Sequence, residues 1–192
     1  MFQIRIHGRG GQGVVTGAEL LSVAAFIEGR HAQAFPSFGS ERMGAPVMAF
    51  CRIADREIRL REPVLAPNAL IIQDSTLLHQ VDLFNGLATD GYVLINSRRS
   101  FGELGIAEMV YGGNRQRRCT VPATSLAMKH IGRPLPNAAL LGGFAAISRQ
   151  VRLESVAEAI RQKFPRAIAE QNFAAAEEAF ALVSRAEENA DA

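Results

Sequence analysis

Residues 7–17, His-Gly-Arg-Gly-Gly-Gln-Gly-Val-Val-Thr-Gly, decide the fold of this chain. The residues before them, 2–6, alternate apolar and polar side chains as a strand does, and residues 18–27 repeat apolar side chains at helical spacing. Between the two lie glycines in the G-x-G-x-x-G order of a nucleotide-binding crossover: Gly8, Gly10 and Gly13. The first glycine would turn sharply, the second would let a phosphate approach the backbone, and the third would let the helix pack on the strand.

The helix that follows this turn would present free N–H groups and a positive dipole to an anion. The same turn is equally compatible with a tight structural connection or a subunit contact that holds no ligand. A dinucleotide site of the usual kind needs an acidic residue about 20 positions further on, at the end of the second strand. Glu28 lies near that distance but in the last turn of the first helix, and the extended residues 31–35 lead to no acid. We therefore expect neither NAD nor FAD.

Length and composition indicate one domain. The chain has 192 residues, of which 48% are apolar and 21% charged, and we expect a single domain over residues 1–184 with an alanine- and glutamate-rich tail at 185–192. The net charge of +2 is too small to indicate binding to nucleic acid or to an anionic membrane surface. Met1 leads directly into a strand, and no apolar run approaches the ~18 residues of a membrane span. We expect a cytoplasmic protein with no membrane partner.

The cysteines and histidines indicate no metal centre. Cys51 and Cys119 lie far apart without a C-x-x-C motif, and the four histidines show neither H-x-x-H nor H-x-x-x-H spacing. A G-x-S-x-G elbow for covalent catalysis is also missing. The chain therefore offers a phosphate cradle and surfaces, but no identifiable acid, base or nucleophile.

A long polar loop at residues 36–46 follows the first helix and the short extended run after it. It contains two prolines, two glycines and two serines, a composition typical of loops that bind ligands or partners. In that interpretation a polar ligand or a partner chain meets Ser37, Ser40 and Arg42. The alternative is a hairpin-like link that carries a solvated Glu41–Arg42 pair.

The strands that follow predict the fold class. Residues 47–53 and 57–61 predict an edge hairpin that is basic, which could guide phosphates but more often protects an edge from aggregation. Buried strands at 69–74, 92–97 and 119–122 alternate with helical stretches. We expect an α/β protein: a three-layer, Rossmann-like open sheet, mainly parallel, with helices on both faces, one basic edge hairpin and C-terminal helices.

Residues at the ends and in the middle of these elements carry narrower predictions. Asp74 ends a buried strand and is as compatible with capping the next helix as with contacting a ligand. Asn137 is a good N-cap for an apolar helix, in which Gly142 and Gly143 cost stability and so predict close packing against another backbone. Two amphipathic helices separated by Pro165 complete the chain.

Taken together, these motifs resemble the gamma subunit, or gamma domain, of the 2-oxoacid:ferredoxin oxidoreductases, the family of pyruvate synthase. The resemblance spans most of the chain in the family's order and is carried by residues 7–16, 32–47, 58–61, 73–74, 132–134 and 137–142. One departure is Arg42-Met43-Gly44, where many members have Arg-Arg-Gly. It weakens any role assigned to the second position.

The resemblance implies a multi-subunit enzyme that converts a 2-oxoacid and coenzyme A to acyl-CoA and CO2, and passes electrons to ferredoxin or another acceptor. Thiamine diphosphate and 4Fe-4S clusters are then expected on partner subunits of alpha, beta and delta type. This chain would hold no cofactor by itself and would contribute no catalytic residue.

Coenzyme A is the ligand that this resemblance implies for the glycine turn. We expect contacts from the turn and from the loop after it: Gly8, Arg9, Gly10, Gly11, Gln12, Gly13, Thr16, Ser37, Ser40 and Arg42. Two alternatives stay open. The chain is a structural subunit whose glycine turn packs on a partner, or it is a stand-alone nucleotide-binding oxidoreductase, against which the missing acid argues.

Overall fold

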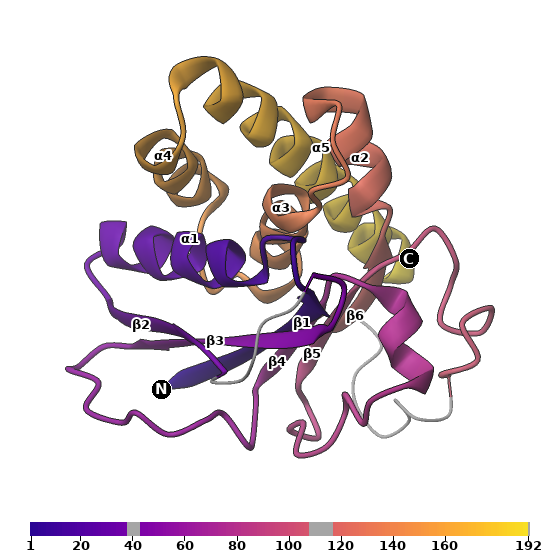
Figure 1. Ribbon diagram of the computed structural model, residues 1–192, viewed down its shortest axis with the longest axis horizontal. Coiled ribbons are helices and arrows are strands. Elements are labelled where there is room, and N and C mark those ends of the chain that lie inside the picture. The colour runs from indigo at the N-terminus through magenta and orange to yellow at the C-terminus, as the bar shows by residue number, and fades with distance from the viewer. Residues whose placement is uncertain (38–42, 108–116, 192) are drawn as a thin grey trace.

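The computed structural model describes residues 1–37, 43–107 and 117–191, with the elements labelled in Figure 1. The strands are β1 (Phe2–Arg9), β2 (His31–Pro36), β3 (Pro46–Ala54), β4 (Ala69–Ile72), β5 (Tyr92–Asn96) and β6 (Arg118–Val121). The helices are α1 (Val14–Ile27), α2 (Ala123–Ile131), α3 (Asn137–Ser148), α4 (Leu153–Lys163) and α5 (Arg166–Asp191), with one 3-10 turn, η1 (Ser75–His79). Helix α5 thus continues through residues 185–191, where the sequence suggested a tail.

One six-stranded sheet in the order β2-β3-β1-β4-β5-β6 organises the molecule. Strands β1, β4, β5 and β6 are parallel, whereas β3 pairs antiparallel with both β1 and β2. The mainly parallel, open α/β sheet is therefore confirmed. Since β1 and β4 are neighbours and the chain leaves them toward opposite sides of the sheet, their carboxyl ends form a topological switch point, where open α/β sheets bind ligands.

The basic edge hairpin was predicted wrongly. Residues 57–61 form no strand, and the hairpin partner of β3 is β2. The reason is that β1 and β2 occupy both edges of β3, so no ladder is left for residues 57–61. Arg52 is also not part of a basic edge. Its buried guanidinium donates to Gln3 Oε1 at 3.0 Å and to the Glu62 carbonyl, and lies over the Phe35 ring.

The two faces of the sheet are covered differently. The main core joins the five α-helices to one face, where Ile4, Ile6 and Ile71 point, and Figure 1 shows the helices together on that side. On the other face Ile72 and Ile95 pack against η1 and the chain between residues 83 and 106. Helices on both faces were expected, but in the described chain the third layer consists of one 3-10 turn and loops.

Helix α3 lies at the centre of the helical layer, buried along its whole length as its apolar sequence predicts. A Cβ on Gly142 would overlap the carbonyl of Ala176 in α5, so the two helix backbones touch there. This confirms the predicted backbone contact for Gly142, whereas a Cβ on Gly143 would meet the side chains of Leu94 and Val183 at 3.4 Å. None of the helices in the described ranges is both long and apolar enough to cross a membrane.

Candidate functional site

The glycine turn joins β1 to α1, but the structural roles of its individual glycines differ from those predicted. Gly8 lies inside β1 rather than in the turn, and a Cβ there would sit 2.6 Å from Val14 Cγ2, so Gly8 is the glycine that lets α1 approach the strand. Gly11 and Gly13 make the turn, with φ angles of 92° and 75° that only glycine adopts without strain. Gly13 is also the N-cap of α1.

The N-terminus of α1 is left open by the chain. Gly13 provides no capping side chain, and the first turn of the helix contains no acidic residue. None of the described residues accepts a hydrogen bond from the N–H groups of Val14, Val15 or Thr16. These groups therefore face the switch point as free donors at the positive end of the helix dipole.

The end of the loop at 36–46 lies against the glycine turn, as expected if both serve one site. The Gly10 N–H donates to the Ala45 carbonyl at 2.9 Å, and the Gly44 N–H donates to the Gly10 carbonyl at 3.1 Å. Met43 lies over Gly11 with 87% of its side chain exposed. Ser37 instead continues the pairing of β2 with β3, through its N–H to the Met48 carbonyl. Ser40 and Arg42 lie outside the described residues.

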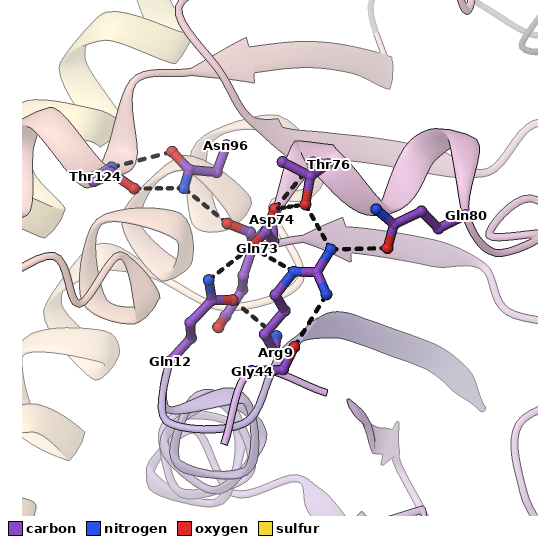
Figure 2. A network of polar contacts seen from close by, with 9 residues as sticks. All are labelled: Arg9, Gln12, Gly44, Gln73, Asp74, Thr76, Gln80, Asn96 and Thr124. Carbon is purple, nitrogen blue, oxygen red and sulfur yellow. Dashed lines mark hydrogen bonds and ion pairs between the residues drawn. The ribbon is translucent and has the colours of Figure 1, made fainter. Parts of the chain in front are cut away.

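Arg9 and Gln12 are held in a network around Asp74, which Figure 2 shows. Arg9 forms an ion pair with Asp74 at 3.2 Å and also donates to the Gly44 carbonyl, to Thr76 Oγ1 and to Gln80 Oε1. Gln12 accepts from the Arg9 N–H and donates to Asp74 Oδ2, both at 2.8 Å. Two of the residues expected to meet a ligand are thus bound within the chain itself.

Asp74 is ionised in this network and caps η1. Its Oδ1 accepts from both the N–H and the hydroxyl of Thr76, which is an N-capping contact. Burial alone would raise the pKa of Asp74. Hydrogen bonds from Thr76 and Gln12 and the positive charge of Arg9 outweigh burial and hold the pKa below its ordinary value.

Two side-chain amides with little exposure lie beside the α1 N-terminus, and the oxygen of one of them is buried without a hydrogen-bond partner among the described residues. Gln73 follows β4 and is 2% exposed, and its Oε1 is fully covered and unpaired. Asn137, 6% exposed, was expected to cap α3 but is instead its first helical residue after the N-cap Pro136. Its Nδ2 would lie 2.9 Å from a Cβ on Gly13. An unpaired buried amide costs roughly 1–3 kcal/mol.

Asn96, at the end of β5, is by contrast fully paired. Its Nδ2 donates to the Gln73 carbonyl at 2.8 Å and to Thr124 Oγ1 at 2.7 Å, and its Oδ1 accepts from the Thr124 N–H at 3.0 Å (Figure 2). Asn96 therefore ties the ends of β4 and β5 to the first turn of α2.

A hollow of about 360 Å³ opens over these strand ends. It is lined by Gln12, Gln73, Asp74, Ser75, Asn96, Ser97, Arg98, Arg99, Pro122, Thr124 and Ser125. A second hollow, of about 430 Å³, lies between the end of α3, the start of α4 and α5, and includes no residue predicted to belong to a site. The first hollow is the candidate site because it lies over the carboxyl ends of β4 and β5, beside the switch point, and Gln12 of the glycine turn is part of its lining.

Sequence reasoning missed Gln73 and Asn137 as residues of the site. Both lie in stretches that carry the family resemblance, 73–74 and 137–142, but nothing in those stretches indicated that the two side chains would lie close together beside α1. Asn96 also gave no signal beyond its place at a strand end. No group of three or more histidine, cysteine or acidic side chains suited to a metal ion occurs within the described ranges.

Comparison with known proteins gives a family. A family model described as pyruvate ferredoxin/flavodoxin oxidoreductase matches residues 3–182. Pyruvate synthase subunit PorC of Methanosarcina barkeri is 48% identical over 161 residues, which are 84% of this chain and 85% of that protein. The common gamma subunit of the pyruvate/ketoisovalerate oxidoreductases of Thermococcus kodakarensis is 45% identical over 94% of this chain and 96% of its own. The crystal structure of pyruvate oxidoreductase subunit PORC from Thermotoga maritima matches with a TM-score of 0.81 at 34% identity, over 94% and 95% of the two chains.

Proposed function

The chain belongs to the pyruvate ferredoxin/flavodoxin oxidoreductase family, and we propose that it is the gamma subunit of a multi-subunit 2-oxoacid:acceptor oxidoreductase. The family match agrees with the resemblance drawn from the glycine turn and the loop that follows it. In the proposed reaction a 2-oxoacid and coenzyme A give acyl-CoA and CO2, and ferredoxin or another acceptor takes the electrons. The relative from Thermococcus kodakarensis is named as common to pyruvate and ketoisovalerate oxidoreductases, so we propose the substrate only as a 2-oxoacid.

Thiamine diphosphate and iron–sulfur clusters are proposed to lie on partner subunits of alpha, beta and delta type. Of the two cysteines in this chain, Cys51 does not suit a cluster ligand. Cys51 is completely buried in the sheet, where burial raises the pKa of its thiol to about 12, whereas a cluster ligand must be a thiolate. When bound in the assembled enzyme, thiamine diphosphate would supply the carbon chemistry.

The role proposed for this chain is to hold coenzyme A. The observation that carries it is the open N-terminus of α1, whose free N–H groups face the switch point. Coenzyme A has amide carbonyl and phosphate oxygens, and both accept hydrogen bonds from such donors. Arg9 supports the turn through its network around Asp74, and Asp74 in turn holds Gln12 in place.

The test is Gly11→Asp in the assembled oxidoreductase, with Gly11→Asn as the matched control of similar shape. The new carboxylate would compete for the free N–H groups and repel the phosphates of coenzyme A, so we expect the KM for coenzyme A to rise at least tenfold more than in the asparagine variant. Decarboxylation of the 2-oxoacid, measured without coenzyme A, should persist. A KM equal in the two variants would refute the proposed role.

One observation favours the alternative that the glycine turn is a subunit contact. Met43 places an exposed thioether side chain directly over Gly11, as a residue that a partner covers would. Hydrogen exchange on the whole complex separates the two roles. A ligand site gains protection at residues 8–17 when coenzyme A is added, whereas a pure contact is equally protected with and without it.

A further inference from the structure

The two outer edges of the sheet differ in how they are protected from other chains. Strand β6, at one edge, has four residues and begins with the charged Arg118. Strand β2, at the other edge (Figure 1), has six residues, pairs with β3 without a bulge, and carries no lysine, arginine or acidic side chain. Edge strands are normally blunted by charge, proline, shortness, a bulge or a covering segment. Within the described ranges β2 has one such feature, the proline at its last residue, Pro36.

The hydrogen bonds of β2 to β3 show which backbone groups of β2 face outward. The Ser37 N–H donates to the Met48 carbonyl, and in an antiparallel ladder every second residue bonds to the same partner strand. The residues two and four positions before Ser37 therefore also bond to β3, whereas the N–H and C=O groups of Ala32 and Ala34 point away from it. None of the described residues bonds to these outward groups. Strand β2 thus offers another strand an unoccupied ladder.

The two alanines can pair fully with β2 of a second copy in one antiparallel register. When Ala32 lies opposite Ala34 of the second copy, the reverse pair forms as well, and each pair exchanges both backbone bonds. Sliding the strands one way sets Ala32 against Pro36, which has no N–H to donate. Sliding them the other way sets Ala34 against Arg30, whose N–H already donates to the Ala25 carbonyl at 3.1 Å. Only the first register satisfies every outward group of the alanines.

The side chains of β2 suit the same register. Gln33 lies on the two-fold axis, opposite Gln33 of the second copy, and Phe35 lies opposite His31 of the second copy, so no like charges meet at neutral pH. The strand is also held extended by its own sheet. The Phe35 ring packs on the Phe50 ring at a centroid distance of 5.1 Å, and Arg52 Nη1 lies 3.5 Å from Gln33 Oε1. Little freedom is lost on pairing, because β3 has already ordered β2.

We propose that β2 is a pairing edge, through which two copies of this chain join their sheets about a two-fold axis at Gln33. The occupant is a second copy because the sequence of β2 itself satisfies the outward bonds of both alanines and brings no like charges together. One strand of six residues makes a small contact, so the chain alone forms a weak dimer. The pairing uses the sheet edge alone and does not depend on the ligand of the carboxyl ends.

Sedimentation velocity of the purified full chain over a range of concentrations tests this pairing. Ala34→Pro removes one outward N–H and leaves the bonds to β3 in place, so we expect the dissociation constant of the dimer to rise by about tenfold or more. Gln33→Lys and Gln33→Glu each set two like charges opposite each other on the axis and should weaken the dimer similarly. Mixed together, the two charge variants should associate about tenfold more tightly than either does alone.

The control is Gln162→Lys, which makes the same charge change at an exposed glutamine of α4 and should dimerise as the wild-type chain does. Circular dichroism of each variant shows that it is folded, and the mixing experiment does not depend on the proline variant. A wild-type chain that stays monomeric, or a dimer that responds to none of the β2 variants, would overturn the proposal. If the lone chain is monomeric but the Ala32 and Ala34 N–H groups exchange slowly in the assembled oxidoreductase, another subunit covers this edge and the second copy is the wrong occupant.

Discussion

Helix α1 begins at Val14, after the N-cap Gly13, and no side chain caps its first N–H groups. Helix α2 follows β6, three strands away along the same edge of the sheet, and there the Thr124 N–H donates to Asn96. We call the connection from β1 to α1 the open junction and the connection from β6 to α2 the closed junction. At the closed junction both polar atoms of the Asn96 amide are hydrogen-bonded. At the open junction, by contrast, Gln73 Oε1 is buried without a partner among the described residues. Both junctions follow parallel strands of one sheet, so the difference lies in these side chains and not in the architecture.

The difference indicates which junction serves the fold and which serves a ligand. A paired amide such as Asn96 stabilises the native chain, because each of its bonds would otherwise leave a buried group unsatisfied. An unpaired amide such as Gln73 costs stability, and that cost is offset when a ligand supplies the missing bond. Stability measurements can therefore sharpen the comparison without any ligand, because the two junctions should respond to substitution with different sizes and signs.

The largest expected effect is on the strand that leads into the open junction. His7 lies in β1 on the face opposite α1 and is 3% exposed, with Nε2 unpaired among the described residues. Burial, helped by the positive charge of Arg5, lowers the pKa of His7 to about 3. The unfolded chain binds this proton near pH 6.5 and the folded chain only near pH 3. Stability is therefore lost as the pH falls through that window, by up to about 4–5 kcal/mol.

Urea unfolding of the purified chain between pH 7 and pH 4 measures this loss. His7→Gln should flatten the pH dependence, and His31→Gln, at an exposed histidine, should leave it steep. Carboxylates such as Asp74, whose pKa is lowered, contribute mainly below this window. Equal pH slopes for the wild-type chain and the His7 variant would show that His7 can be protonated in the folded state.

The next effect is expected at the closed junction. Asn96→Leu keeps the size of the side chain but leaves the Gln73 carbonyl, the Thr124 N–H and the Thr124 hydroxyl without their partner. We expect a loss of about 3 kcal/mol in the free energy of unfolding. Asn85→Leu is the control, because that side chain is exposed on a loop. A loss of stability no larger than that of Asn85→Leu would mean that water satisfies the groups bonded to Asn96, and that Asn96 does not stabilise the start of α2.

Much of this fold could be predicted from local patterns. Apolar alternation, the glycine turn and the buried strands gave the strand–turn–helix start and the mainly parallel sheet, and a glycine pair in an apolar helix gave the contact of Gly142 with α5. The wrong hairpin shows the limit of such patterns. Residues 57–61 alternate apolar and polar side chains as an edge strand does, but β3 pairs with β1 on one side and β2 on the other. Which strands pair with β3 depends on the whole fold and cannot be predicted from the sequence of residues 57–61 alone.

The candidate site was predictable only in outline. The glycine turn and the end of the following loop were expected to meet and do so at Gly10, because both are recognisable motifs. The commitment of Arg9 to Asp74 was not predictable, since it depends on how two strand ends pair across the sheet. Gln73 and Asn137 were missed for a similar reason. Being unpaired is a property of the folded surroundings, which no spacing in the sequence encodes.

The smallest expected change is the most telling, because its sign should be opposite to that of Asn96→Leu. Gln73→Met keeps the length of the side chain and removes an amide that is buried without a partner, while the backbone bonds of residue 73 to His7 and Asn96 remain. We expect the free energy of unfolding to stay within about 1 kcal/mol of wild type, on the stabilising side. Urea unfolding of the chain measures it, beside Gln80→Met at an exposed glutamine that should change nothing beyond its bond to Arg9. A loss of 2 kcal/mol or more would mean that Gln73 is satisfied by water, and the two junctions would then be closed alike.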